Sequence, residues 1–233
     1  MKYNKQLVIG AGEIGTSLYN VLKPHYDVSI RDEKDDIEGQ FDVLHICYPP
    51  IENFIDVTKA YIDKYEPQLV IIHSTVPVGT TSKLGNIAVH SPMRGVHPHL
   101  EEQIKIFVKY FSGGKAEEAA QIFSQIGIET KIFDKPETTE LLKILSTTYY
   151  AWNVVFQKEV KRICDEYKLD FNEVYTIPNN DYNEAYKKIG MGYVTRPVLK
   201  DISGPIGGHC LILNCEILED WLTETIKKKN KDY

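Results

Sequence analysis

A glycine-rich turn near the N-terminus constrains this chain more than any other feature of its sequence. The apolar residues 6–9 lead into Gly10-x-Gly12-x-x-Gly15, and a helix-like segment follows over residues 16–22. Glycine permits a tight turn at the first position, a close approach of backbone to a pyrophosphate at the second, and close packing of helix on strand at the third. The pattern therefore predicts a dinucleotide-binding turn, with the positive end of the helix facing the phosphates. The expected cofactor contacts are Gly10, Gly12, Glu13, Ile14 and Gly15.

A carboxylate after the next apolar segment indicates which dinucleotide is bound. Residues 27–31 predict a second strand, and Asp32 follows it at a separation of 32 − 10 = 22 positions from Gly10. That is close to the roughly 20 positions expected for a carboxylate that binds the adenosine ribose. Such a carboxylate accepts from the free 2′-hydroxyl of NAD and repels the 2′-phosphate of NADP. NAD is therefore predicted, with NADP as the alternative, because Arg31 could hold a 2′-phosphate unless strand alternation turns it away.

Composition excludes several classes of partner. The chain has 233 residues, 42% of them hydrophobic, which is enough for one or two domains with a full core. Its formal net charge is −6 and no basic stretch carries interleaved aromatic residues, so no nucleic-acid partner is expected. Neither a signal peptide at residues 1–6 nor a long apolar run is apparent, so we expect a cytoplasmic protein without a membrane partner. The cysteines at 47, 164, 210 and 215 are expected to be reduced thiols.

Strand-like and helix-like segments alternate through the first part of the chain. Further strands are predicted over residues 42–47, 69–73, 87–90, 106–111 and 130–133. This alternation is typical of an α/β fold with a doubly wound, mostly parallel sheet. We therefore expect residues 1–135 to form a Rossmann-type NAD-binding domain.

The pattern changes at Pro136. Residues 137–167 predict one long helix without internal proline or glycine, and its apolar residues lie on more than one face. Such a helix must be covered from several sides. Residues 136–233 are accordingly expected to form an all-α domain that contributes to the substrate site and to a homodimer.

Polar residues after several strands are candidates for a ligand site. Ligands of open α/β sheets bind beyond the carboxyl ends of the strands. At these positions stand Tyr48 and Pro49, then Ser74 and Thr75, all expected to contact the cofactor. Further along, His90 and Arg94 are candidate substrate contacts, and the arginine suggests a small anionic substrate. The spacing of His90, His97 and His99, interrupted by Pro98, fits no metal motif, so no metal is expected.

Two residues of the second part could carry chemistry. Lys143 lies in an otherwise apolar helix, on one stripe with Glu140 and Thr147. Cys210 follows two glycines and His209, which could lower the pKa of the thiol. A solvated lysine and a buried structural cysteine are the alternatives.

Several motifs together resemble the UDP-glucose/GDP-mannose dehydrogenase family. They are the Gly10 turn, residues 42–50 (DVLHICYPP), residues 74–81 (STVPVGTT), Glu140-x-x-Lys143, Phe156-x-x-Glu159 and residues 207–210 (GGHC). The last form is similar to the branch acting on N-acetyl-mannosamine-type nucleotide sugars. The resemblance implies a 6-phosphogluconate dehydrogenase-like fold and oxidation of a sugar C6 alcohol to a carboxylate with two NAD. It also implies that Cys210 is the nucleophile, that Lys143 stabilises the alkoxide and oxyanion, and that Thr75 lies near the nicotinamide.

The chain departs from the family's pattern at several positions. Thr147 replaces the asparagine four residues after the lysine, and Asn214 replaces the aspartate four residues after the cysteine. The family's glutamate-bearing PEFLREG segment is represented by residues 91–95, SPMRG. The family's third, nucleotide-gripping domain is also expected to be absent from this chain.

The sequence therefore predicts an NAD-dependent oxidoreductase that acts on a CH–OH group of a small molecule. One alternative is a two-electron, hydroxyacid-type dehydrogenase with a small anionic substrate. The other is a non-catalytic NAD-binding sensor or regulatory subunit, because an asparagine at position 214 cannot act as a base.

Overall fold

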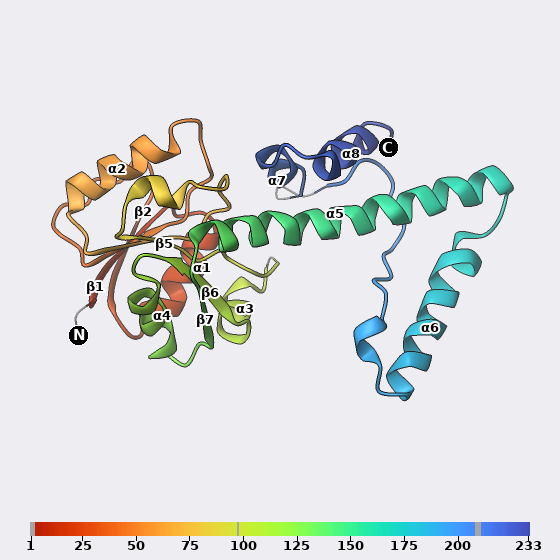
Figure 1. Ribbon diagram of the computed structural model, residues 1–233, viewed down its shortest axis with the longest axis horizontal. Helices are drawn as coiled ribbons and strands as arrows, with labels where there is room; N and C mark the ends of the chain where they lie inside the picture. The colour runs from red at the N-terminus through yellow and green to blue at the C-terminus, as the bar shows by residue number, and fades with distance from the viewer. Residues whose placement is uncertain (1–2, 97, 208–210) are drawn as a thin grey trace. The chain divides into compact units, whose positions relative to one another are not determined.

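The computed structural model describes residues 3–96, 98–207 and 211–233, which form two compact units. Unit 1 ends at Lys143 and unit 2 begins at Ile144, so this division falls inside a long helix. The first turns of that helix belong to unit 1 because Thr139 and Glu140 make buried hydrogen bonds with its loops and strands. Figure 1 traces the chain through both units.

Unit 1 is built on a seven-stranded sheet in the order β2-β1-β3-β4-β5-β6-β7. All pairs are parallel except β5 with β6, which confirms the expected doubly wound, mostly parallel α/β fold. The strands are β1 (Lys5–Ile9), β2 (Asp27–Arg31), β3 (Val43–Ile46), β4 (Leu69–Ile72), β5 (Ala88–His90), β6 (Lys109–Gly113) and β7 (Thr130–Phe133).

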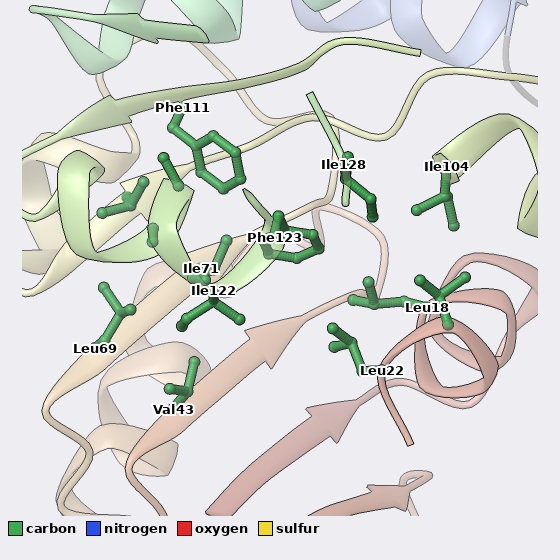
Figure 2. Close-up of a cluster of buried hydrophobic side chains, with 14 of the residues drawn as sticks. Leu18, Leu22, Val43, Leu69, Ile71, Ile104, Phe111, Ile122, Phe123 and Ile128 are labelled. Carbon is green, nitrogen blue, oxygen red and sulfur yellow. The ribbon is translucent and has the colours of Figure 1, made fainter. Parts of the chain in front are cut away.

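Helices cover both faces of this sheet. Those of unit 1 are α1 (Glu13–Leu22), α2 (Phe54–Tyr65), the 3-10 turn η1 (Thr81–Leu84), α3 (Leu100–Ile106), α4 (Ala116–Ser124) and the start of α5 (Pro136–Tyr167). Figure 2 shows one core cluster, in which Leu18 and Leu22 of α1 and Phe123 of α4 pack with Val43 and Ile71 of the sheet. On the other face, Phe54 and Tyr65 of α2 pack with alternate residues of the same strands.

The central strands explain why the sheet lies between two layers. β3 and β4 have the sequences VLHI and LVII, and every residue in them is buried. Successive side chains of a strand point to opposite faces, so a continuous apolar run requires cover on both sides. The strand predictions for residues 27–31 and 130–133 are confirmed to the residue.

One predicted strand was partly wrong. Residues 106–111 were expected to form a strand, but Ile106 ends α3 and the strand begins at Lys109. Leu100 and Ile104, four residues apart, are buried on one side of α3, whereas Ile106 is 73% exposed. The helical period of the buried residues therefore prevails over the apolar character of Ile106.

The regular structure among the described residues of unit 2 consists of helices and helical turns. It comprises the remainder of α5, the π-helical turn η2 (Asn172–Thr176), α6 (Ile177–Lys188), the 3-10 turn η3 (Gly192–Val194), α7 (Leu211–Ile217) and α8 (Trp221–Asn230). The long helix predicted over 137–167 is confirmed as α5. One side of α5 packs with α7 and α8 through Ala151, Val155, Cys215 and Ile226. Near its end, Cys164 packs with Phe171 and Tyr175.

A chain of buried polar side chains crosses the core of unit 1. Lys109 Nζ lies 3.3 Å from His73 Nδ1, and His73 Nε2 lies 3.0 Å from His45 Nδ1. The other ring nitrogen of His45 lies 2.8 Å from Gln6 Oε1. Since the Gln6 amide nitrogen donates to Tyr3 O, its oxygen must accept, and His45 Nε2 carries the proton. Burial lowers the pKa of Lys109 to about 7 and that of His45 to about 3.

The depressed pKa of Lys109 predicts how stability depends on pH. An unfolded lysine titrates near 10.4, so between about pH 7 and 10 the unfolded chain binds more protons and wild-type stability rises with pH. Lys109→Met removes this contribution. The stability of the variant relative to wild type should therefore fall as pH rises from 7 to 10, by up to about 1.4 kcal/mol per pH unit. Urea unfolding at several pH values measures it, with Lys131→Met on the exposed side of β7 as the control. Parallel pH profiles for Lys109→Met and wild type would contradict it.

Candidate functional site

The glycine turn lies where the strand order reverses. β1 is flanked by β2 and β3, and the crevice at such a switch point is the usual ligand site of open α/β sheets. Gly10 has φ 102°, and a Cβ there would lie 2.8 Å from Tyr48 N after β3. A Cβ on Gly15 would lie 1.8 Å from Gly10 O. Both positions therefore require glycine, since any side chain would push α1 or β3 away from the turn.

Gly12 differs from these two glycines. A Cβ on Gly12 would meet nothing within 4 Å, so the position borders open space. Gly12 is also the N-cap of the ten-residue helix α1 and supplies no side-chain cap. The first N–H groups of a helix need an external acceptor, and an anion is a suitable one. The turn thus has the open space and the donors that a pyrophosphate requires.

Asp32 and Arg31 lie at the end of β2 with opposite exposure. Asp32 is exposed, and its backbone N–H donates to Asp35 Oδ2 at 2.7 Å. Arg31 is buried, and its guanidinium donates to Tyr65 Oη at 3.1 Å and to the carbonyls of Asp32 and Glu33. The guanidinium also lies 5.1 Å from the centre of the Tyr61 ring. Arg31 therefore organises the loop that presents Asp32, with its charge directed into the protein.

The next two strands deliver Tyr48 and Ser74. The Ser74 hydroxyl donates to Tyr48 O at 2.5 Å, which ties the end of β4 to the end of β3. The Tyr48 hydroxyl pairs with Thr58 Oγ1 at 2.6 Å, and burial raises its pKa to about 12. Pro49 is exposed and Thr75 is half-buried beside them. Four of the predicted cofactor residues thus come together at one edge of the sheet.

Helix α5 is joined to the loop after β4 by a carboxylate. Glu140 Oε2 accepts from Gly79 N at 2.6 Å, and Oε1 accepts from Thr81 N at 2.8 Å. Lys143, half-buried, follows one turn later. The sequence placed Glu140 on one stripe with Lys143 but gave no reason to assign it a role. No local pattern indicates that a helix carboxylate will meet two backbone N–H groups some sixty residues earlier in the chain.

The two candidate substrate residues lie in different surroundings. His90 is fully buried, with Nδ1 2.7 Å from Thr139 Oγ1 and Nε2 3.2 Å from Ser74 O. Burial lowers its pKa to about 3, so the ring is neutral and both nitrogens have protein partners. The Arg94 guanidinium lies 4.8 Å from the Tyr110 ring centre and 5.6 Å from that of Phe107. Its Nη1 reaches Val108 O at 3.5 Å. His90 thus has no free nitrogen for a substrate.

Two further candidates meet within unit 2. Asn214 of α7 donates from Nδ2 to Thr147 Oγ1 of α5 at 3.3 Å, and Thr147 donates to Ile144 O at 2.8 Å. These are the two positions where the sequence departs from the family's asparagine and aspartate. His209 and Cys210 lie outside the described residues.

The described residues contain neither a candidate metal site nor a candidate membrane span. No three histidine, cysteine or acidic side chains among them are arranged to hold a metal ion. Within the same ranges, no helix combines the length and apolarity needed to cross a bilayer.

Comparison with known proteins identifies relatives of both units. Residues 137–225 match the central domain of the UDP-glucose/GDP-mannose dehydrogenase family. The UDP-N-acetyl-D-mannosamine dehydrogenase of Pyrococcus horikoshii is 21% identical over 237 residues, covering 85% of this chain and 53% of that protein. The chain thus spans about half the length of this curated relative.

Solved structures agree with the fold. UDP-D-ManNAc dehydrogenase of P. horikoshii superposes with a TM-score of 0.79 at 17% identity, covering 97% of this chain and 68% of the other. The 3-hydroxyisobutyrate dehydrogenase of Mycobacterium tuberculosis superposes with a TM-score of 0.68 at 12% identity, covering 97% and 92%. The central-domain match and the relative aligned over most of the chain agree with the resemblance to the UDP-glucose/GDP-mannose dehydrogenase family.

Proposed function

We propose that the protein is an NAD-dependent oxidoreductase that oxidises a CH–OH group of a sugar derivative, within the nucleotide-sugar dehydrogenase family. The observation that carries the proposal is the open, uncapped turn at Gly12 beside the exposed carboxylate of Asp32. A dinucleotide fits there, with its pyrophosphate on the N-terminus of α1 and its ribose diol on Asp32. NAD, when bound, accepts a hydride from the substrate carbon.

The residues of the chain have distinct roles in this proposal. The nicotinamide is held against one side of its pocket, which is formed by Tyr48, Pro49, Ser74 and Thr75. Lys143 stabilises the alkoxide that develops as the hydride leaves, since an ammonium group favours negative charge on oxygen. Cys210, with His209 beside it, is the nucleophile of a second oxidation, a role that rests on the GGHC motif. Thr147 and Asn214 orient one another by a hydrogen bond, and the neutral amide of Asn214 stands where family members carry an ionisable aspartate.

The position of Arg31 supports NAD over NADP. Its guanidinium is committed to Tyr65 and to two loop carbonyls, so it is not directed toward a 2′-phosphate. The exposed acidic loop after β2 adds repulsion for that phosphate.

We expect NAD to raise the melting temperature of the protein more than NADP at equal concentration. A ligand that binds only the folded state stabilises it by mass action, about 2.7 kcal/mol at a hundred times its Kd. Asp32→Ala should narrow the difference between the cofactors, because it removes the ribose acceptor and a repulsive charge. Glu38→Ala, which removes an exposed carboxylate from the same loop, is the matched control. Thermal shifts as large with NADP as with NAD in the wild type would rule out this cofactor assignment.

A second candidate function is a two-electron, hydroxyacid-type dehydrogenase with a small anionic substrate. It is favoured by the superposition on 3-hydroxyisobutyrate dehydrogenase, which covers nearly all of both chains, and by Asn214, which cannot act as a base. In this version Arg94 is the anchor for the anion.

The number of NADH molecules formed per substrate separates the two candidates. Oxidation of an alcohol to a carboxylate transfers two hydrides and yields two NADH, whereas oxidation to a carbonyl yields one. Assays with UDP-N-acetyl-mannosamine and with a panel of hydroxy acids should give two NADH on the former. Cys210→Ser should then abolish the second equivalent, whereas Cys164→Ala in α5 should not. One NADH per turnover on a hydroxy acid, unaffected by Cys210→Ser, would establish the alternative, and NAD binding without turnover would indicate a sensor.

A homodimer through α5 also forms part of the proposal. One face of the helix exposes five large apolar side chains, those of Leu145, Tyr149, Phe156, Ile163 and Tyr167. Tyr149 and Phe156 are more than 60% exposed. Contiguous exposed apolar side chains mark interaction surfaces. A second copy of the same helix is a suitable occupant, because a two-fold interface needs a self-complementary patch.

Charges introduced on this face should separate the subunits. We expect the wild type to have twice the monomer mass in light scattering at micromolar concentration, and Tyr149→Lys with Phe156→Lys to have the monomer mass. Ser146→Lys, at an exposed polar position of the same helix, should leave the dimer intact. A wild type that is monomeric under these conditions would disprove the dimer.

A further inference from the structure

The carboxylate of Glu140 is buried, and its two oxygens are bound to one loop. The side chain has no exposed surface, and each oxygen accepts one backbone N–H, from Gly79 and from Thr81. A buried carboxylate is costly unless such donors satisfy it. Charge-assisted hydrogen bonds of this kind are among the stronger ones in proteins. The contact is therefore a specific attachment between α5 and the loop after β4.

That loop carries the residues assigned to the nicotinamide pocket. Residues 73–80 lie between β4 and η1 and form no helix or strand. At the start of the loop, the Ser74 hydroxyl donates to Tyr48 O. In the middle, Val76 is buried in the core. At the end, Glu140 holds Gly79 and Thr81, so Thr75 lies between an anchor at Tyr48, just after β3, and an anchor on α5.

The helical end of the attachment is also rigid. Thr139 Oγ1 lies 2.7 Å from His90 Nδ1 of β5 and 2.5 Å from Ser112 Oγ of β6. These groups are fully buried, so the first turns of α5 are fixed to the sheet. Lys143 follows Glu140 by three positions, which places the two on the same face of the helix.

We propose that Glu140 is a positioning residue that fixes the loop bearing Ser74 and Thr75 to the helical turn bearing Lys143. It thereby sets the distance between the nicotinamide pocket and the Lys143 ammonium, which stabilises the negative charge that develops on the substrate oxygen. The inference rests on the proposed function, because it takes Thr75 and Lys143 to act on the cofactor and substrate. A shift of about 1 Å in such a spacing can lower the rate roughly a hundredfold.

The chemistry of the contact explains why a carboxylate is needed. A carboxylate presents an acceptor to both backbone donors, whereas an amide presents one acceptor and one NH₂ group. In Glu140→Gln, one of the two backbone N–H groups would therefore face another donor in a buried place. Glu140→Asp keeps the charge on a shorter side chain and should be intermediate. Glu137→Gln is the matched control, since Glu137 is on the same turn and accepts from Ser82 at 2.7 Å, but that pair is exposed.

The experiment uses the full-length chain and two readouts. Amide hydrogen exchange measures the attachment itself, and isothermal titration with NAD measures its consequence for the folded protein. In Glu140→Gln we expect the amides of Gly79 and Thr81 to exchange at least about tenfold faster, as loss of a charged hydrogen bond implies. We expect the Kd for NAD to rise by about tenfold, with a smaller rise in Glu140→Asp and none in Glu137→Gln.

A purely structural role would give a different result. In that case Glu140→Gln would melt at a lower temperature but bind NAD with wild-type affinity, and this outcome would overturn the proposal. If Glu140→Gln does not fold, the same comparison is decided by Glu140→Asp, and an unchanged Kd again overturns it. Failure of the wild type to bind NAD would overturn the proposed function, whereas unchanged amide exchange at Gly79 and Thr81 in Glu140→Gln would overturn the positioning role. The amide exchange distinguishes the two failures, because it reports on the attachment whether or not NAD binds.

Discussion

The arrangement of unit 1 depends on the close contact between Gly10, just after β1, and Gly15 of α1. A Cβ on Gly15 would lie 1.8 Å from the carbonyl of Gly10, so α1 can approach the sheet this closely only with glycine at both positions. This approach buries Leu18 and Leu22 against the strands, as Figure 2 shows. It also leaves the N-terminus of α1 open at Gly12. The same steric requirement thus governs the core packing and the candidate cofactor site.

Buried polar groups give the helices of this protein defined positions, which apolar packing alone does not. Apolar contacts stabilise helices such as α1 and α4 against the sheet but are non-directional. The hydrogen bonds of Thr139 and Glu140 specify one position for α5, because each buried donor and acceptor must be satisfied. Lys109 shows the cost of such groups, since burial lowers the pKa of its amine to about 7. The polar interior of unit 1 therefore combines precise placement with a dependence of stability on pH.

The second unit poses the main chemical question. Thr147 and Asn214 are hydrogen-bonded to each other at the positions where the family carries other polar residues. Neither side chain ionises in the physiological range, so this pair can orient a substrate or a water but cannot take up a proton. In the proposed reaction this pair therefore does not act as the base, and the ammonium group of Lys143 stabilises the alkoxide. This makes the geometry around Glu140 and Lys143 central to the proposed chemistry.

Local sequence patterns were sufficient to predict the fold class, the approximate positions of the strands along the chain and the glycine turn. These depend on local periodicity and on glycine sterics, which act over a few residues. The sequence predicted Asp32, Tyr48 and Ser74 at one sheet edge, because the carboxyl ends of parallel strands meet there. The packing of distant segments was needed to establish that Arg31 is turned into the protein, that His90 is a neutral core residue, and that Glu140 binds a loop distant in sequence. Each of these depends on partners dozens of residues away, and burial and hydrogen bonding across such distances leave no local pattern in a sequence.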